Sequence, residues 1–529
     1  MKLLLIRESN TIYRYSNTSY GLTLIGTIAK SVATVRILDN NAIRKEYSNQ
    51  EIIQEIQKFN PDVIGFNIHS YNILATRKLI TQIRRQLPGI CLIAGGLHTF
   101  SAPDEVADSH VDIVVKGEGD AVIVPLLNIL KPYVVGHETR PFVLSEPLSR
   151  ELQAIKGLIF QPPGQPRVDT GWPDLFTDFD SLPFVDYTLC NLQDFIRAKE
   201  DEQFVTNVLI TQRGCPYQCT FCQLPLKSMI KVREHSTEYR LDYYEYLIKR
   251  HHLKHIVFYD NNFTINKHRT LEFCQGIIKR GLHKQVSFSC QTNVVLPLDD
   301  DLLTTMRQAG CNEIALGVER MSEDSLGRIK KNKNHARILE NINQINKNNI
   351  DVVVNCLIGL PFDTADIVNQ ENELFKSIIG KVKACSINTT LPPPGTEIYN
   401  HTPYKQWYLD EKIMGWRPSF YHLAYGYTNN AYDVNYFNLD ADTQRAIKLF
   451  KEQFYDLTLQ QMNSRLINAI HFLEKQLAIP SYALFRISPK WEHWLFYLPK
   501  VVRSNLHNYF RANFYVWRNR TENKEDCTI

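Results

Sequence analysis

The feature that most constrains the fold is an alternation, along most of the chain, of short aliphatic segments with longer stretches of helical periodicity. In the N-terminal part, the aliphatic segments are residues 3–6, 34–39, 63–68, 90–96 and 112–116. Such an alternation predicts a doubly wound, mostly parallel sheet with helices on both faces. We therefore expect an α/β, Rossmann-like domain over residues 1–135.

A second alternating series starts at Phe204. Its expected strands are residues 205–211, 255–259, 286–290, 313–317, 351–358 and 384–389. Helical patterns separate them, at residues 238–250, 267–280, 299–309, 335–347 and 364–379. This series predicts a partial (β/α)6 barrel over residues 204–400, open on one side. In barrels of this kind the reactive groups lie at the carboxyl ends of the strands.

Two segments lack this alternation. Residues 136–203 are rich in proline and polar turns, which indicates a linker with a small hairpin near residues 157–168. Residues 401–529 are expected to form a mainly helical C-terminal domain, with helical periodicity over 440–476 and an aromatic, basic remainder. A chain of 529 residues is long enough for several domains.

Composition excludes some classes of protein. A formal net charge of +4, from 60 basic and 56 acidic residues, is too small for a surface that coats nucleic acid, so we expect no nucleic-acid partner. No apolar run approaches the roughly 18 residues needed to cross a bilayer. The apolar run at residues 3–6 ends at Arg7 and suits a buried strand better than a signal peptide. We therefore expect a cytoplasmic protein whose 11 cysteines are thiols or metal ligands rather than disulfides.

Three cysteines lie close together in the loop that follows the first strand expected in the barrel. Cys215, Cys219 and Cys222 are separated by three and then by two residues. Three thiolates from one loop can each bind a different iron of a [4Fe-4S] cubane and leave the fourth iron without a protein ligand. The alternatives are a zinc site with His235 as a distant fourth ligand, a redox dithiol, which needs only two cysteines, and an accidental grouping.

The spacing, with Phe221 just before the last cysteine, resembles the CxxxCxxC signature of the radical S-adenosylmethionine (SAM) superfamily. The resemblance implies a [4Fe-4S] cluster held by Cys215, Cys219 and Cys222, whose open iron chelates the amino and carboxylate groups of SAM. It also implies that one electron, from a donor such as flavodoxin or ferredoxin, cleaves SAM to a 5′-deoxyadenosyl radical. In such enzymes the cofactor carries the chemistry and the protein positions it.

Further motifs that resemble those of the superfamily follow at the ends of successive expected strands. They are an aromatic residue beside adenine (Phe221), an Asp-Asn-Asn-Phe element (residues 260–263) and a Gly-Val-Glu element (residues 317–319). A basic residue that pairs with the SAM carboxylate (Lys331) and two glycine-containing elements (residues 357–361 and 393–396) follow. The SAM-binding residues so implied are Phe221, Asp260, Asn262, Glu319, Lys331, Ile358, Gly359 and Gly395. Taken singly, each is more often a cap, a turn or a surface charge. The third strand departs from the pattern at residues 291–293, where many relatives carry Arg or Asp.

Glycine turns also follow the strands expected in the N-terminal domain. Glycine at a strand end lets a flat or phosphate-bearing ligand approach the backbone, although an isolated glycine is more often an ordinary tight turn. The set resembles the cobalamin-binding domain that precedes some radical SAM barrels. The residues implied to border cobalamin are Ser70, Gly95, Gly96, His98, Gly117, Glu118 and Gly119, with Ser70 bonding the nucleotide tail.

The Asp-x-His-x-x-Gly motif of other cobalamin proteins is absent after the first strand. Its absence implies base-off cobalamin without a histidine ligand, so neither His69 nor His98 is assigned to cobalt. Loss of cobalamin binding is the alternative.

Together the two resemblances imply a class of reaction. In this family a radical made from SAM removes hydrogen from an unactivated carbon, and the substrate radical takes a methyl group from methylcobalamin. The related group includes hopanoid methylases and the anaerobic magnesium-protoporphyrin ester cyclase. A non-methylating oxidative cyclase or rearrangement enzyme is therefore one alternative, and a catalytically degenerate cobalamin or iron–sulfur binding protein is another.

The aromatic and basic tail gives a hint about the substrate. Its aromatic or apolar and basic residues are Trp491, Trp494, Leu495, Phe496, Tyr497, Lys500, Arg503, Arg511, Arg518 and Arg520. The favoured interpretation is a helix packed on the barrel with its basic residues solvated. The mixture is also typical of interfacial helices, so peripheral membrane contact is the alternative. We therefore expect a small-molecule or lipid-like substrate.

Overall fold

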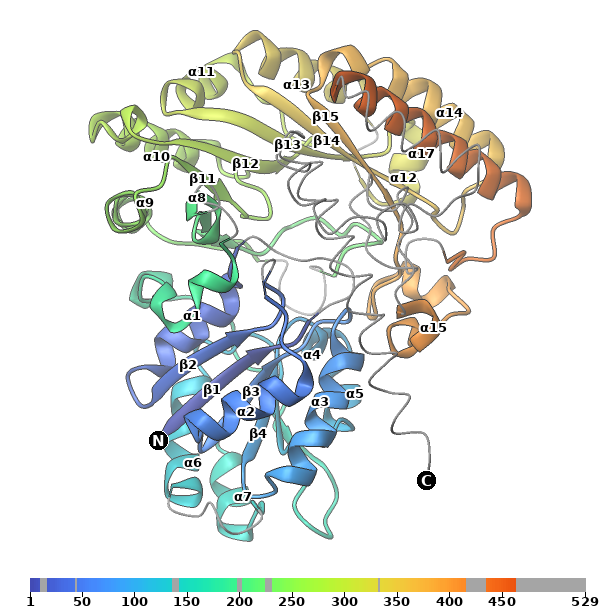
Figure 1. Ribbon diagram of the computed structural model, residues 1–529. Helices are drawn as coiled ribbons and strands as arrows, with labels where there is room; N and C mark the ends of the chain where they lie inside the picture. Colours follow the sequence, from blue (N-terminus) through green and yellow to red (C-terminus); the bar gives the residue numbers. More distant parts are fainter. Residues whose placement is uncertain are drawn as a thin grey trace, which may run out of the picture.

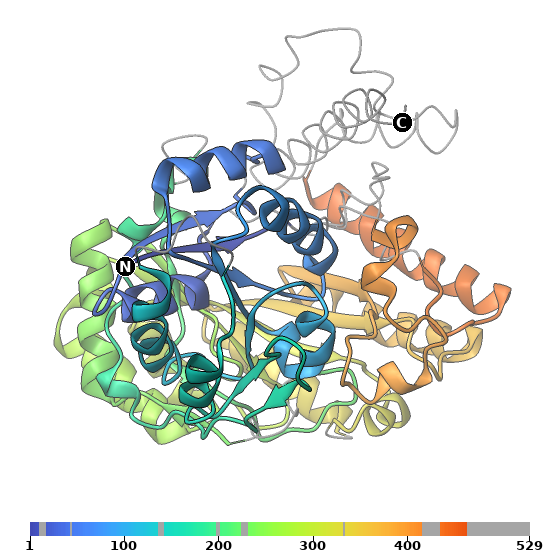
Figure 2. The same ribbon diagram turned by 90° about the horizontal axis from the view of Figure 1, so that it is seen from below.

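A computed structural model describes residues 1–9, 17–42, 45–135, 142–196, 202–223, 231–331, 334–414 and 434–462. Within these ranges the chain forms two α/β domains, each built on one large sheet (Figures 1 and 2). In Figure 1 the blue N-terminal domain lies below, and the green-to-orange second domain arches above it. The predicted fold class is confirmed.

The first sheet has seven strands in the order β2-β1-β3-β4-β5-β6-β7. They are β1 (Lys2–Arg7), β2 (Thr34–Asp39), β3 (Val63–Asn67), β4 (Cys91–Gly95), β5 (Ile113–Val115), β6 (Leu158–Phe160) and β7 (Val168–Asp169). Strands β1 to β5 pair in parallel, as predicted. The hairpin expected in the linker is present as β6 and β7. It adds to β5 in antiparallel register, so the first sheet extends past residue 135.

Helices cover both faces of this sheet, which is why its strands are apolar on both sides. They are α1 (Tyr20–Ala29), α2 (Asn49–Phe59), α3 (Ile73–Gln86), α4 (His98–Ser101), α5 (Pro103–Ala107), α6 (Ile123–Val134) and α7 (Glu146–Leu152). Leu22 of α1 packs on one face and Ile53 of α2 on the other. At the start of α2, Ser48 and Glu51 form a capping box, in which each side chain accepts a bond from the other residue's backbone N–H.

The second sheet has six strands in the order β15-β14-β13-β12-β11-β8, all paired in parallel. They are β8 (Val208–Leu209), β11 (His255–Phe258), β12 (Ser287–Asn293), β13 (Cys311–Glu319), β14 (Asp351–Ile358) and β15 (Ala384–Thr389). The strand predicted over residues 205–211 is much shorter than expected. Helix α8 (Glu202–Val205) precedes it, and the chain then leaves the sheet to form a ribbon in which β9 (Gln212–Arg213) pairs antiparallel with β10 (Arg233–Glu234).

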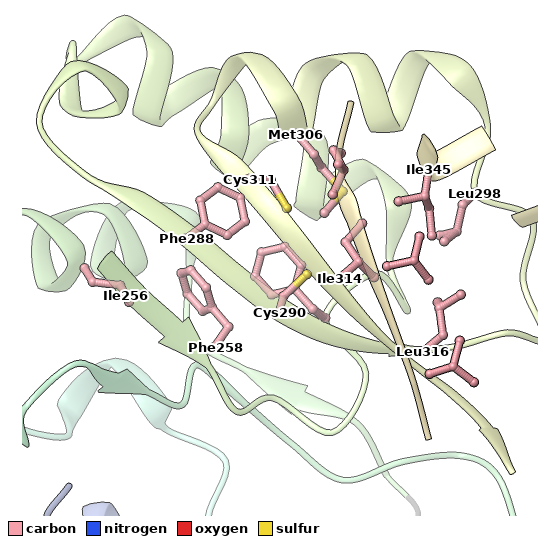
Figure 3. Close-up of a cluster of buried hydrophobic side chains, with 14 of the residues drawn as sticks. Ile256, Phe258, Phe288, Cys290, Leu298, Met306, Cys311, Ile314, Leu316 and Ile345 are labelled. Atoms are coloured by element: carbon pink, nitrogen blue, oxygen red, sulfur yellow. The ribbon is translucent and has the colours of Figure 1, made fainter. Parts of the chain in front are cut away.

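The predicted barrel helices are present along the outer side of the second sheet (Figure 1). They are α9 (Thr237–His251), α10 (Lys267–Lys279), α11 (Asp300–Gln308), α13 (His335–Lys347) and α14 (Ala365–Lys376). A further short helix, α12 (Glu323–Arg328), was not predicted. Aromatic rings and thiols fill the space between sheet and helices, where Phe258, Phe288, Cys290 and Cys311 are buried (Figure 3). Cysteine in such a setting acts as a small apolar side chain.

The described segments after β15 pack on both domains. Trp407 and Tyr408, just before α15 (Glu411–Met414), are buried against the core of the first domain. Helix α17 (Ala441–Met462) packs on α14, where the rings of Phe450 and Phe375 are 5.8 Å apart. The helix expected from residue 440 is thus confirmed as far as Met462, whereas the aromatic and basic tail lies outside the described residues. In the described ranges, no helix has the length and apolarity required to cross a membrane.

Candidate functional site

The three motif cysteines lie in the loop between β9 and β10. Cys215, Cys219 and Cys222 are partly exposed, whereas six of the other seven described cysteines are buried. A backbone bond of 3.2 Å from Thr220 N to Ile329 O ties this loop to the barrel just after α12. The loop therefore presents its thiols at the end of the second sheet.

Lys331 brings a positive charge to this loop. Burial raises the pKa of the Cys215 and Cys219 thiols. The positive charge of Lys331 lowers the pKa of both thiols, which shows that the lysine lies beside the loop. Lys331 Nζ also donates to the Gly317 carbonyl and lies 3.6 Å from Glu319 Oε1. The structure thus brings together the cysteine loop and the acidic and basic residues predicted to bind SAM.

Glu319 has a strained backbone at the end of β13. Its φ of 65° lies in the left-handed region, which is uncommon for a residue with a side chain. The register between β13 and β14 also shifts between Gly317 and Glu319, and such irregularities re-aim a side chain. Burial raises the pKa of Glu319, and the charge of Lys331 lowers it. Strain of this kind clusters at functional sites.

A buried ion pair shapes the next strand end. Arg320 is fully buried, and one of its terminal nitrogens donates to both oxygens of Asp363, at 2.9 and 2.6 Å. The same carboxylate accepts bonds from the N–H groups of Gly359 and Leu360, at 2.8 and 3.0 Å. Asp363 therefore fixes the turn predicted to lie beside adenine, in which Gly359 has a φ of 74°.

Three other predicted SAM residues lie at the same end of the barrel. Phe221 packs against a small apolar cluster that includes Leu360. Ile358 is fully buried, and its carbonyl oxygen accepts bonds from both the N–H and the hydroxyl of Thr390. Gly395 has a φ of 81°, so its turn favours glycine.

Asp260 and Asn262 have mainly internal partners. Asp260 is buried, and its carboxylate accepts bonds from the N–H groups of Thr211 and Gln212 at 2.6 and 2.9 Å and from the Thr211 hydroxyl at 2.7 Å. This carboxylate therefore holds the segment that leads into the cysteine loop, and a contact of Asp260 with SAM stays a prediction. Asn262 Oδ1 accepts a bond from the Thr292 hydroxyl, but its buried Nδ2 has no hydrogen-bond partner among the described residues, which leaves a donor for a ligand.

A cavity of about 410 Å³ lies between the two domains, at the carboxyl ends of β1, β3, β4 and β5. Open α/β sheets bind ligands in this crevice, and the volume is in the range of small-molecule sites. The second domain supplies the opposite wall. Its lining residues are Ile210, Gln212, Arg213, Gly214, Arg233, Tyr259 and Asn261.

Most of the residues predicted to border cobalamin line this cavity. They are Gly95, Gly96, Gly117, Glu118 and Gly119. At Gly95 an added Cβ would make only an ordinary van der Waals contact, 3.9 Å from Val115, so the neighbouring atoms do not by themselves require glycine here. At Gly96 the turn itself requires glycine, because φ is 113° and a Cβ would lie 2.6 Å from the Ile68 carbonyl oxygen.

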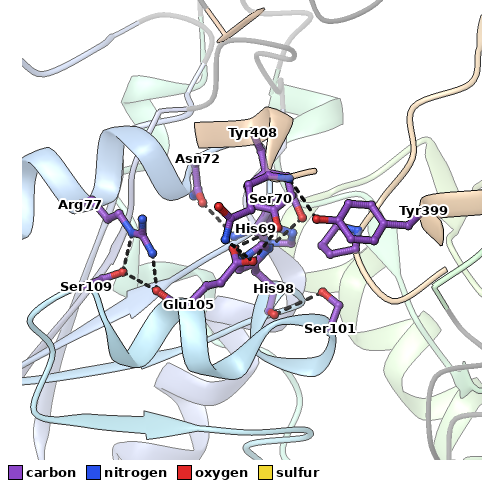
Figure 4. Close-up of polar contacts among 12 residues, drawn as sticks. His69, Ser70, Asn72, Arg77, His98, Ser101, Glu105, Ser109, Tyr399 and Tyr408 are labelled. Atoms are coloured by element: carbon purple, nitrogen blue, oxygen red, sulfur yellow. Dashed lines mark hydrogen bonds and ion pairs between the residues drawn. The ribbon is translucent and has the colours of Figure 1, made fainter. Parts of the chain in front are cut away.

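Ser70 and His98 differ from the prediction, because they are buried together and are not among the residues that line the cavity. The Ser70 hydroxyl lies 2.8 Å from His98 Nδ1. His98 Nε2 lies 3.4 Å from the carboxylate of Glu105, which accepts a bond from the Tyr408 hydroxyl (Figure 4). These side chains therefore link the first domain to the segment after the barrel. His69 lines the cavity instead, and burial lowers its pKa to about 4.

Two arginines of the ribbon pair with acidic residues of the first domain. Arg233 donates to both oxygens of Glu118, each at 2.7 Å, and Arg213 to both oxygens of Asp120, at 2.7 and 2.9 Å. The Glu118 carboxylate, predicted to contact cobalamin, is thus engaged by Arg233. Asp120, Arg213 and Arg233 were not predicted from the sequence, although Asp120 directly follows the predicted glycine turn and Arg213 lies just before the cysteine motif.

His235, the distant zinc candidate, is a buried member of an aromatic stack. Its ring lies parallel to that of Tyr239, with centroids 4.0 Å apart. Its side chain is thus held by ring contacts, and its Nδ1 lies 3.5 Å from the carboxylate of Asp180.

Replacing His235 by phenylalanine is expected to make the fold less sensitive to acid. Burial lowers the pKa of His235 to about 4, whereas an unfolded histidine titrates near 6.5. Between these values the unfolded chain binds a proton that the folded chain does not, so His235 costs stability as the pH falls from 6.5 towards 4. The urea midpoint should therefore drop less between pH 7.5 and pH 5 in His235→Phe than in the wild type. His268→Phe, at a histidine whose side chain is 81% exposed, is the control, and equal drops in all three proteins would contradict the expectation.

Two family profiles match the chain, one on each domain. The B12 binding domain matches residues 14–127, and the radical SAM superfamily matches residues 209–370, which include the cysteine loop. The chain is a radical SAM protein with a B12-binding domain.

Curated relatives of this radical SAM protein include methyltransferases and cyclases. An uncharacterised methyltransferase of Pyrococcus horikoshii is 24% identical over 427 residues, which are 79% of this chain and 86% of the relative. The anaerobic magnesium-protoporphyrin IX monomethyl ester cyclase of Cereibacter sphaeroides is 26% identical over 337 residues, which are 62% of this chain. The chain spans about half of that cyclase, 52% of its length.

Solved structures of cobalamin-dependent and radical SAM enzymes share the fold. The radical enzyme OxsB, with aqua-cobalamin and SAM bound, is 14% identical and has a TM-score of 0.64, with 97% of this chain and 75% of that chain covered. The methyltransferase TsrM of Kitasatospora setae, with cobalamin and a [4Fe-4S] cluster bound, is 16% identical and has a TM-score of 0.58, with 75% and 77% covered.

The cofactors of these two domains are a [4Fe-4S] cluster, SAM and cobalamin, and the residues present fit them. For the cluster, one loop offers three partly exposed thiols with a lysine beside two of them. For cobalamin, the cavity wall carries three buried polar atoms without a hydrogen-bond partner in the described ranges: Asn67 Oδ1, Gln212 Oε1 and Arg233 Nε. Buried polar groups normally find partners, and the amide groups around a corrin ring supply both donors and acceptors.

Proposed function

We propose that this protein is a cobalamin-dependent methyltransferase of the radical SAM superfamily, which methylates an unactivated carbon of a small-molecule or lipid-like metabolite. The cavity between the domains carries the proposal. Its wall joins the glycine turns of the B12-binding domain to the ribbon from which the cysteine loop departs. In the proposal, the substrate lies between the B12-binding domain and the start of the cysteine loop, where Gly214 lines the cavity.

The chain's own residues bind and orient the reacting groups. When bound, the cluster and SAM supply a radical that removes hydrogen from carbon, and cobalamin supplies the methyl group. In the proposal, Lys331 holds the SAM carboxylate, and Glu319 accepts a bond from the SAM amino group. Tyr259, which is half-exposed and lines the cavity, contacts the substrate.

Replacing Lys331 by glutamine is expected to weaken SAM binding about tenfold or more, because hydrogen bonds to charged groups contribute roughly 1.5–3 kcal/mol. Lys330→Gln is the matched control, since the neighbouring Lys330 side chain is 53% exposed and pairs with Glu397. SAM affinity is measured by equilibrium dialysis on anaerobically reconstituted protein, with equal iron content in every sample. Equal affinities of the two variants would argue against the assigned role of Lys331.

The function is tested by anaerobic reconstitution with iron, sulfide and hydroxocobalamin, followed by incubation with a strong reductant and SAM labelled in its methyl group. We expect 5′-deoxyadenosine to form and the label to appear in the bound cobalamin. Absence of 5′-deoxyadenosine would favour a degenerate binding protein.

A radical cyclase is the second candidate, because magnesium-protoporphyrin ester cyclases are among the relatives. The same assay separates it from a methyltransferase. A cyclase forms 5′-deoxyadenosine but transfers no label to cobalamin, and that outcome would overturn the methyltransferase proposal. Peripheral membrane contact through the tail also stays a prediction, for which liposome co-sedimentation of full-length and tail-truncated protein is the test.

A further inference from the structure

We propose that the β9–β10 ribbon couples cobalamin binding to the cysteine loop, with Arg213 and Arg233 as positioning residues. The proposal rests on the cofactors of the two domains and not on methyl transfer. It therefore applies equally to a methyltransferase and to a cyclase.

The ribbon holds both ends of the cysteine loop at one place. Arg213 and Arg233 are paired across it, and Cys215 follows Arg213 by two residues. Both guanidinium groups reach into the B12-binding domain, where they bind Glu118 and Asp120 in the turn after β5. A movement of this turn is thus transmitted to the base of the loop.

The two ion pairs restrict how the domains move against each other. Each is bidentate, and two parallel bonds fix the orientation of the groups as well as their distance. Three of the four side chains are at most 11% exposed, Arg213 being 22% exposed, so breaking a pair leaves a poorly solvated charge. The ring of Phe179 lies against both guanidinium groups, at 5.2 and 5.5 Å, and Arg233 also donates to the Phe176 carbonyl at 2.7 Å.

The same groups form part of the cavity wall. Arg213, Arg233, Glu118 and Asp120 line it, next to Gln212, whose buried Oε1 has no partner among the described residues. If Gln212 bonded an amide of bound cobalamin, this residue would fix the ribbon and, through the two ion pairs, the turn after β5. Coupling free energies are reciprocal. If bound cobalamin raises the affinity of the cysteine loop for its cluster by some factor, the bound cluster must raise the affinity of the protein for cobalamin by the same factor.

The experiment measures the dissociation constant of hydroxocobalamin, by anaerobic absorbance titration, on the full chain before and after reconstitution of the cluster. We expect wild-type protein to bind cobalamin at least about fivefold more tightly with the cluster than without it. In Glu118→Gln and Asp120→Asn the ratio of the two constants should fall towards one. Glu411→Gln should keep the wild-type ratio, because Glu411 forms an exposed ion pair with Lys78 away from the ribbon.

Taking the ratio within each variant separates coupling from a general loss of folding. Arg233→Lys keeps the charge but cannot form two parallel bonds, so its ratio should lie between those of the wild type and Glu118→Gln. If the wild-type protein binds cobalamin equally well with and without the cluster, the proposal is wrong. It is also wrong if Glu118→Gln and Asp120→Asn both keep the wild-type ratio of dissociation constants. The titration needs neither SAM nor substrate, so its failure is distinct from failure of the proposed function.

Discussion

Replacing Cys219 by alanine is expected to remove the [4Fe-4S] cluster and to reduce SAM cleavage to background. A cluster that already leaves one iron without a protein ligand cannot lose one of its three thiolates and keep the same open site. Iron and sulfide per chain, the electron paramagnetic resonance spectrum of the reduced protein and the yield of 5′-deoxyadenosine measure the effect. The same result is expected for Cys215→Ala and Cys222→Ala.

Cys385→Ala is the matched control for these variants. Cys385 is also partly exposed, but it lies on β15, away from the motif. This variant should keep the cluster and its SAM cleavage. If Cys219→Ala retained a full complement of iron and wild-type cleavage, the assignment of the cluster to this loop would be wrong.

Replacing Asp363 by asparagine is expected to destabilise the fold by about 3 kcal/mol, because it removes the carboxylate that the buried Arg320 binds directly and leaves Glu371 as the buried carboxylate whose charge still acts on it. Asparagine is nearly isosteric, so the change isolates the charge rather than the volume. It should also weaken SAM binding, since Asp363 orders the turn at Gly359 and Leu360. Equilibrium unfolding in urea measures the first effect and equilibrium dialysis the second.

An exposed ion pair provides the comparison for Asp363→Asn. Asp351 pairs with Lys383 at 2.8 Å, and their side chains are 55% and 53% exposed. Asp351→Asn should therefore cost no more than about 1 kcal/mol. Equal losses of stability in the two variants would show that burial does not determine the contribution of Asp363.

Features of the fold that depend on neighbouring residues could be predicted from the sequence. The bounds of β2, β14, β15 and α13 agree with the prediction, because runs of apolar residues and helical periodicity are local signals. The cysteine motif was also predictable, since its three ligands come from one loop. Residues 205–211 show the limit of such signals. The segment is apolar, but its end leaves the sheet, because the Asp260 carboxylate accepts bonds from the backbone N–H groups of Thr211 and Gln212. Asp260 lies 49 residues beyond Thr211 in the chain.

Local patterns in the sequence are thus sufficient to predict two series of parallel strands and a loop able to hold a cluster. Which polar groups remain available to a ligand depends instead on contacts between distant segments. Glu118 lies within a predicted glycine turn and Asp120 directly follows it, yet their carboxylates bind arginines 115 and 93 residues away. Likewise, Ser70 bonds His98 instead of facing the cavity. A buried polar side chain takes whichever partner the packing of distant segments places within reach, and no local pattern encodes that partner.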